Sequence, residues 1–315
     1  MKPKLTRIIC GLTILFLVFA FAFFIIKRAK DNYSSKKIIS SSFVGYDFVR
    51  AISGNDSDVS MLLKPGAEAH SFEPTPEDII DIKNADLFIY TGGESEIWIK
   101  KLLENNEIPK EKTLRLMDFI ELKKEETPKG SEESENDDND EYDEHIWTSL
   151  TNAKIILTEI KNKLISLYPE KEQLFEENYK NYFERLEKID KEIKNVVSKS
   201  DKNELIFGDR FPFRYFVDEY DLKYYAAFPG CSEQTEASSN TISLLVKEAK
   251  EKDIHVVLKI ELTSDKLAKT IADELNAKVL ELNSAHNISQ TDFENGKTFA
   301  DIFEENVEVL REALK

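Results

Sequence analysis

Short apolar runs alternate with longer amphipathic segments along most of the chain. Runs rich in Ile, Leu, Val and Phe predict buried strands, and apolar residues spaced three and four apart predict helices. The predicted strands are 37–43, 59–63, 85–90, 113–116, 204–207, 223–228, 255–262 and 278–282. The predicted helices are 44–52, 78–85, 96–103, 145–167, 170–197, 211–220, 235–250, 264–275 and 295–314. This alternation predicts mostly parallel sheets whose faces are covered by helices.

One predicted helix is much longer than the others and separates two similar halves. Segment 170–197 places Leu186, Ile189 and Ile193 on one face, and at about 1.5 Å per residue it is long enough to run the height of a domain pair. We therefore predict an α/β protein with two lobes, each holding a mostly parallel sheet flanked by helices, joined by this connecting helix. The predicted domains are 1–36 as an N-terminal anchor or signal with a tether, 37–168 as the N-lobe, 169–198 as the connecting helix and 199–315 as the C-lobe.

The first residues form a separate apolar segment. Residues 8–26 are almost wholly apolar, and Lys and Arg flank them on both sides. This run is long enough to span a bilayer and longer than the usual apolar region of a cleaved signal. We expect an uncleaved membrane anchor, with a cleaved signal as the alternative. The basic flanks on both sides leave its orientation open.

The composition is strongly acidic, with a formal net charge of -17 and a pI near 4.9. Nucleic acid and anionic lipid surfaces require a basic partner, so this charge argues against both. Acidic residues crowd the segment 123–144, which has almost no apolar residues. Such a segment cannot bury a core, so we predict a solvated loop. The functional alternative is an arm that gathers cations beside His145.

The stretch 66–78, Gly-Ala-Glu-Ala-His-Ser-Phe-Glu-Pro-Thr-Pro-Glu-Asp, places His70 between a predicted strand and a predicted helix. Thr75 is a suitable N-cap, Pro76 suits the first helical position, and the acids that follow favour the positive end of the helix dipole. We therefore expect His70 on a short, rigid loop at the carboxyl end of a strand. Ligand sites of open α/β sheets form at that edge.

Three of the four histidines, His70, His145 and His286, lie at the end of a predicted strand or at the start of a predicted helix. The fourth, His255, is followed by Val residues in a predicted strand, where we expect it to pack. Imidazole is a common protein ligand of first-row metals. Three imidazoles on equivalent edges of two lobes predict a metal site to which both lobes contribute.

A carboxylate would complete such a site. Asp209, at the end of its strand, is the best placed, and Glu233 and Glu236 are the alternatives. The chain has no His-Glu-x-x-His, no Gly-x-Ser-x-Gly and no glycine loop of the phosphate-binding kind. A metal-dependent hydrolase built from the same histidines stays an alternative, because it requires only an open coordination position and a nearby base.

Three stretches carry a resemblance to a known family. They are the stretch 66–78, then Glu144-His-Ile-Trp after the acidic segment, then Phe213-Arg-Tyr-Phe followed by Tyr220-Asp-Leu. From about Ile38 onward the chain resembles the zinc- and manganese-binding solute receptors of ABC importers. The resemblance implies two α/β lobes joined by one rigid helix, with the metal between the lobes.

The resemblance also implies that His70 and His145 are the N-lobe ligands. The C-lobe departs from the family pattern, because Asp209-Arg210-Phe211-Pro212 stands where many zinc members carry a His and manganese members a Glu. We therefore predict His70, His145, Asp209 and His286 as the metal shell. Three imidazoles and one carboxylate favour Zn(II), and a shell with more oxygen ligands would favour Mn(II).

These observations predict a receptor, not an enzyme, that captures Zn(II) between its lobes and delivers it to the permease of an ABC importer. We expect it outside the cytoplasm, tethered to the membrane by its N-terminal segment. A manganese receptor of the same type, a metal-dependent hydrolase, and an adhesin-like surface protein with a structural metal are the alternatives. We expect a monomer that binds no nucleic acid, with the zinc ion and the permease as its partners.

Overall fold

The computed structural model describes residues 36–54, 57–105, 107–129, 141–230 and 236–315. The predicted anchor at 8–26, the centre of the acidic loop and Glu233 lie outside these ranges. Residues 37–315 form one compact unit. None of the helices in the described ranges combines the length and the apolar composition that crossing a membrane requires.

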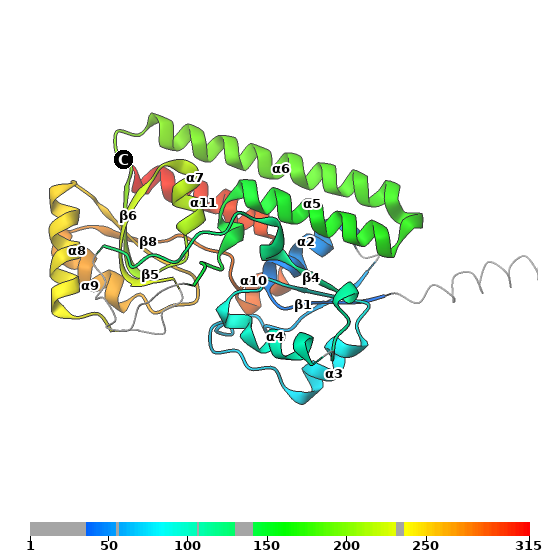
Figure 1. Ribbon diagram of the computed structural model, residues 1–315. Helices are drawn as coiled ribbons and strands as arrows, with labels where there is room; N and C mark the ends of the chain where they lie inside the picture. The colour runs from blue at the N-terminus through cyan, green and yellow to red at the C-terminus, as the bar shows by residue number, and fades with distance from the viewer. Residues whose placement is uncertain (1–35, 55–56, 106, 130–140, 231–235) are drawn as a thin grey trace, which may run out of the picture. The chain divides into compact units, whose positions relative to one another are not determined.

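Two four-stranded sheets form the frame of the protein (Figure 1). The strands of the N-lobe are β1 (Lys37–Ser40), β2 (Asp58–Met61), β3 (Leu87–Tyr90) and β4 (Thr113–Arg115), in the order β2-β1-β3-β4. The strands of the C-lobe are β5 (Glu204–Phe211), β6 (Lys223–Pro229), β7 (Val256–Lys259) and β8 (Lys278–Glu281), in the order β6-β5-β7-β8. Neighbouring strands are parallel in both sheets, so the predicted fold class is confirmed.

Helices cover both sheets, and one of them runs past both. The helices are α2 (Phe43–Ser53), α3 (Pro76–Asn84), α4 (Ile97–Glu104), α5 (Leu150–Leu167), α6 (Glu172–Lys199), α7 (Arg214–Tyr220), α8 (Ser239–Glu251), α9 (Lys266–Leu275), α10 (Gln290–Glu294) and α11 (Phe299–Ala313). Helix α6 has 28 residues, which gives it a length of about 42 Å. It lies along one side of both sheets, next to α5 and α11 (Figure 1).

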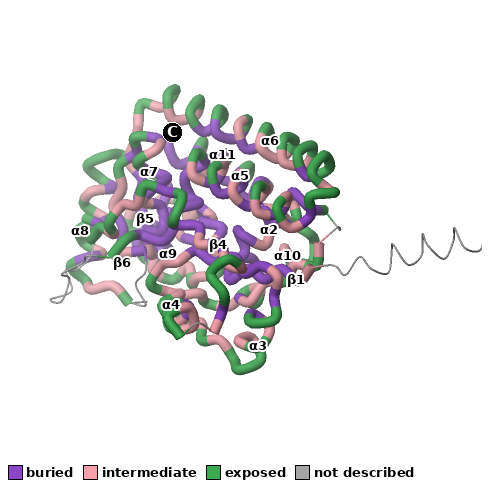
Figure 2. The backbone as a smooth tube through the Cα atoms, turned by 45° about the vertical axis from the view of Figure 1, so that its right-hand side comes forward, coloured by how far each residue is buried: buried purple, intermediate pink, exposed green. Residues whose placement is uncertain are grey.

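The largest hydrophobic cluster spans both lobes, and each lobe has a smaller cluster of its own. The buried residues of the largest cluster run from Ile38 in β1 to Leu314 after α11, and it includes Phe175, Leu186 and Ile193 of α6. The opposite face of α6 is exposed (Figure 2). Because α6 packs against α2 and α5 of the N-lobe and against α11 near the C-terminus, it is an integral part of both lobes.

A buried carboxylate joins three of these helices. Asp47 of α2 accepts hydrogen bonds from the Tyr182 hydroxyl of α6 (2.7 Å) and from the backbone N–H of Phe299 at the start of α11 (3.1 Å). Burial raises the pKa of Asp47 to about 6, although these hydrogen bonds and Arg50 favour the ionised form. A charged group is therefore held at the junction of the two lobes.

Two local predictions are wrong, each for a physical reason. Segment 59–63 was expected to be a buried strand, but β2 is the edge strand of its sheet and its residues are half-buried or exposed. His255 was expected to pack, but its side chain is 65% exposed beside Asp253, because it precedes the first residue of β7. The predicted last helix corresponds to α11, which starts a turn later than expected at a capping box formed by Thr298 and Asp301, and the short helix α10 before it was not predicted.

Two helix starts also differ from the prediction. A short 3₁₀ helix, η4 (Ile146–Thr148), follows His145, and α5 begins only after the Ser149 N-cap, whose hydroxyl accepts from the N–H of Asn152. Helix α9 begins at Lys266, two residues later than predicted, and the Ser264 hydroxyl accepts from the N–H of Lys266 (3.3 Å). The predicted capping box at Thr75, with Pro76 in the first turn of α3, is confirmed.

The sheets place their loops where a site can form. The first strand of each sheet, β1 or β5, has the second strand on one side and the third and fourth strands on the other. The direction in which strands are added therefore reverses beside β1 and beside β5. A crevice opens beyond the carboxyl ends of the strands at such a point. The loops that follow β2, β7 and β8 all contribute to one cavity there.

Candidate metal centre

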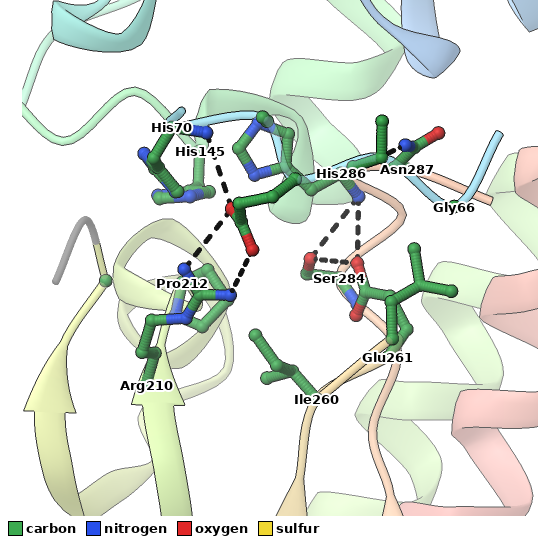
Figure 3. Close-up of a pocket in the computed structure, with 15 residues that line it drawn as sticks. Gly66, His70, His145, Arg210, Pro212, Ile260, Glu261, Ser284, His286 and Asn287 are labelled. Atoms are coloured by element: carbon green, nitrogen blue, oxygen red, sulfur yellow. Dashed lines mark hydrogen bonds and ion pairs between the residues drawn. The ribbon is translucent and has the colours of Figure 1, made fainter. Parts of the chain in front are cut away.

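The three histidines singled out from the sequence converge on one point (Figure 3). His70 comes from the loop between β2 and α3, His145 from the residue before η4, and His286 from the loop after β8. Their ring centroids are 5.9 Å apart for His70 and His145, and 5.1 Å apart for each of these with His286. Two segments of the N-lobe and one of the C-lobe therefore supply one cluster.

Glu144 adds a carboxylate to this cluster. One ligand atom from each of His70, Glu144, His145 and His286 lies within 4.8 Å of all the others. The Glu144 Oε2 atom accepts hydrogen bonds from the Ser95 N–H (3.1 Å) and hydroxyl (2.9 Å). Its Oε1 atom is buried without a hydrogen-bond partner and lies 3.6 Å from His70 Nδ1. A buried, unpartnered carboxylate oxygen is costly unless a cation binds it, so this atom points to a metal.

The imidazole of His145 is oriented by its neighbour Asp143. Asp143 Oδ1 accepts from the backbone N–H of His145 at 2.8 Å and lies 3.1 Å from the Nδ1 atom of the same ring. Donation from Nδ1 leaves the lone pair on Nε2, which is buried and has no partner. A carboxylate behind an imidazole is the usual support of a metal-binding histidine.

Electrostatics keep two of the imidazoles neutral. Burial, together with His145 and Arg210, lowers the pKa of His70 to about 4. Burial and the neighbouring histidines also hold the pKa of His286 well below its usual value. For His145, burial opposes the charged form but the Asp143 carboxylate prevails and raises the pKa. Neutral imidazoles are the form that binds a metal, so the site is prepared for a cation at neutral pH.

The loops that carry His70 and His286 are bound to each other. The backbone N–H of Gly66 donates to the Ile288 carbonyl (2.8 Å), and the Asn287 side-chain amide donates to the carbonyls of Lys64 (2.9 Å) and Ala67 (2.7 Å). Asn287 is buried. The ligand-bearing loops of the two lobes are thus joined directly beside the histidines, and we call these contacts the loop bridge.

Glu261, just after β7, fixes the His286 loop from the other side. Its carboxylate accepts from the Ser284 N–H (2.7 Å), the Ser284 hydroxyl (2.6 Å) and the His286 N–H (3.1 Å), contacts seen in Figure 3. Full burial raises the pKa of Glu261 despite these donors. Glu261 therefore holds the backbone that presents His286.

Comparison with known proteins identifies the chain. Residues 38–313 match the family model described as "Zinc-uptake complex component A periplasmic", ZnuA. The chain belongs to the ZnuA family. The high-affinity zinc uptake system protein ZnuA of Bacillus subtilis is 30% identical over 299 residues, which cover 91% of each chain. The zinc-binding lipoprotein AdcA of Streptococcus pneumoniae is 27% identical over 311 residues, which cover 98% of this chain.

Solved structures of the ZnuA family share the fold. The Zn(II)-bound ZnuA-like domain of S. pneumoniae AdcA has a TM-score of 0.73 at 25% identity, and the lipoprotein YcdH of B. subtilis has a TM-score of 0.74 at 27% identity. Each comparison covers 89% of this chain and 99% of the other. The chain spans only 60% of the length of the S. pneumoniae AdcA protein, so those relatives have further sequence beyond the part they share with it.

Within this ZnuA-family frame, the structure does not bring Asp209 into the cluster. Asp209 Oδ2 accepts from the Ile260 N–H (3.2 Å) and from the Thr263 hydroxyl, and Oδ1 accepts from the Arg210 N–H (2.8 Å). Its carboxylate thus joins β5 to the end of β7 and is occupied by backbone and hydroxyl donors. Of the two alternatives, Glu236 is exposed and Glu233 lies outside the described residues.

Sequence reasoning missed Glu144 as a candidate ligand, although it precedes His145 directly. The signal that could have found it is the pair of glycines after β3. A Cβ on Gly93 would lie 2.0 Å from Glu144 Oε2 and 2.3 Å from Glu144 Cβ. Only glycine leaves room for the Glu144 side chain here, so Gly92-Gly93 marks the place where a buried side chain from elsewhere must enter.

Proposed function

We propose that this chain is an extracytoplasmic receptor that binds Zn(II) through His70, Glu144, His145 and His286 and passes it to a membrane permease. One observation carries the proposal: three imidazoles, one buried and two half-buried, and one buried carboxylate present their ligand atoms within 4.8 Å of one another. Three nitrogen ligands and one oxygen ligand match the four-coordinate preference of zinc.

The chemistry is capture and release of an ion, and no bond of a substrate is broken. His70 and His286 bind as neutral imidazoles, and Asp143 orients His145 so that its Nε2 atom faces the ion. The charge of Glu144 offsets part of the charge of Zn(II). Because a proton and the metal compete for the same nitrogen atoms, zinc affinity falls first as acid protonates His145, whose pKa is raised, and falls further as His70 is protonated near pH 4.

The named relatives support a location and a partner for this chain. The family model describes a periplasmic component of a zinc-uptake complex, and one relative is named a zinc-binding lipoprotein. We infer that the body of this chain lies outside the cytoplasm, is tethered to the membrane and acts as a monomer. Its partner is then the permease of an ABC importer.

Zinc titration of the 315-residue chain in detergent micelles tests this proposal. His70→Ala, His145→Ala and His286→Ala should each weaken zinc binding by at least about a hundredfold, because each removes one of four ligands. His255→Ala is the matched control, since His255 is exposed beside Asp253 and is not in the cluster. Unchanged zinc affinity in the three cluster variants would refute the proposal.

A further inference from the structure

An arginine stands at the wall of the metal site. Arg210 lies near the end of β5, and its side chain lines the same cavity of about 80 Å³ as His70, His145 and His286. Figure 3 shows Arg210 extending from its strand toward the histidines. Its side chain is 13% exposed. A guanidinium has only donors and a fixed positive charge, so Arg210 cannot be a ligand.

Arg210 instead holds a carboxylate of the His70 loop. Its two terminal nitrogens donate to Glu68, from Nη2 to Oε2 at 3.0 Å and from Nη1 to Oε1 at 3.4 Å. Glu68 Oε1 also accepts from the backbone N–H of His70 at 3.3 Å. This two-point contact fixes the direction of the Glu68 carboxylate as well as its charge.

The other acids of the cavity wall are also occupied. Among the described residues that line the cavity, the carboxylates are Glu68 and Glu261. Glu261 is held by the donors of Ser284 and His286. Glu68, two residues before His70, is held by Arg210. No carboxylate on the described part of this wall is therefore free to join Glu144 as a second oxygen ligand.

Resting on the proposed zinc function, we propose that Arg210 determines which metal the site prefers, because it holds Glu68 away from the ion. The donor set then stays at three nitrogens and one oxygen, which suits four-coordinate zinc. Mn(II) prefers six ligands that are rich in oxygen. A released Glu68 would add the oxygen ligand that manganese needs, at a place where Arg210 now supplies a positive charge.

The test compares Zn(II) and Mn(II) affinities of the 315-residue chain with Arg210→Met and Glu68→Gln, singly and together. Competition with a chromophoric chelator reports zinc, and loss of the electron paramagnetic resonance signal of aqueous Mn(II) reports manganese. Arg210→Met should raise manganese affinity about tenfold and change zinc affinity little. The double variant should return to the wild-type preference, and Glu68→Gln alone should keep it.

Arg311→Met is the control, because Arg311 is a half-exposed arginine of α11 paired with Glu308. An unchanged zinc-to-manganese ratio in Arg210→Met would overturn the inference. A changed ratio that persists in the double variant would also overturn it, since the effect would not then act through Glu68. Should Arg210→Met fail to fold, Arg210→Gln takes its place with the same expectations. A wild-type chain that binds no zinc would refute the proposed function itself.

Discussion

Replacing Glu144 with glutamine should stabilise the metal-free protein and weaken its zinc binding, because one buried carboxylate controls both properties. Glu144 is 1% exposed. Ser95 donates two hydrogen bonds to its Oε2 atom, and its Oε1 atom has no partner. Burial raises the pKa of Glu144, although His145 and Ser95 oppose the shift. The folded chain therefore bears the cost of a poorly compensated charge.

The two effects have opposite signs and can be estimated. Glutamine carries no charge, and its amide N–H can donate toward His70 Nδ1, which lies 3.6 Å from the present Oε1 atom, so Glu144→Gln should raise the free energy of unfolding of the metal-free chain by about 1–3 kcal/mol. Each 1 kcal/mol corresponds to about 2–4 °C in Tm for a domain of this size. Loss of a charged ligand should lower the zinc affinity about a hundredfold, which corresponds to about 3 kcal/mol of binding free energy. The rise in Tm on adding zinc should shrink by the corresponding amount.

Thermal unfolding with a chelator and then with excess zinc measures both effects on the same sample, and a chelator competition gives the affinity. Glu192→Gln is the matched control, because Glu192 is an exposed glutamate of α6. A zinc affinity within threefold of wild type would refute Glu144 as a ligand. An unchanged Tm without metal would refute the reasoning about its buried charge.

Three further changes test other parts of the argument. Asp47→Asn should flatten the pH dependence of stability. With a pKa near 6, Asp47 of the folded chain holds a proton that the unfolded chain releases, so the free energy of unfolding falls by about 2 kcal/mol as the pH rises from 4 to 6. Urea unfolding across this range measures it, and equal slopes would contradict the assignment. Gly93→Ala should displace the Glu144 side chain and lower the zinc affinity about tenfold or more. Chelator competition measures the affinity, and an unchanged value would show that Gly93 is not needed to make room for Glu144. Glu261→Gln removes one acceptor from the His286 loop and should lower the zinc affinity about tenfold. An affinity equal to that of the wild type would show that this loop does not need Glu261.

Local sequence patterns predicted the sheets, most of the helices and the loop that carries His70. These features depend on alternation, caps and apolar spacing, which a short stretch records by itself. The capping box at Thr75 is an example, because the residues that form it are three positions apart. The lobes and the long helix α6 followed from the same local signals.

The choice of carboxylate at the site was not predictable in this way. Asp209 is at the end of a strand, as expected, but Thr263 and the N–H of Ile260 occupy it. Glu144 enters the cluster because Ser95 binds it and Gly93 leaves it room. Those contacts join residues about fifty positions apart, and no local pattern records which side chains meet across such a distance.

The prediction that His255 is buried failed for a related reason. A run of Val and Leu after it predicts a strand correctly, yet the first position of a strand is often beyond the helices that cover the sheet. Val256 is buried while His255, one residue earlier, is exposed. The pattern therefore predicted the strand, but it could not predict at which residue the helices stop covering it.

The shared core has a mechanical consequence for ion release. Helix α6 is continuous and packs with both lobes, so the two lobes resist moving apart. Separating them widely would expose the core that runs from Ile38 to Leu314. The compliant parts are the short loops of the loop bridge, whose hydrogen bonds are each worth about 1 kcal/mol. Opening the site by moving these loops alone therefore costs a few kcal/mol and leaves the packing of both lobes intact.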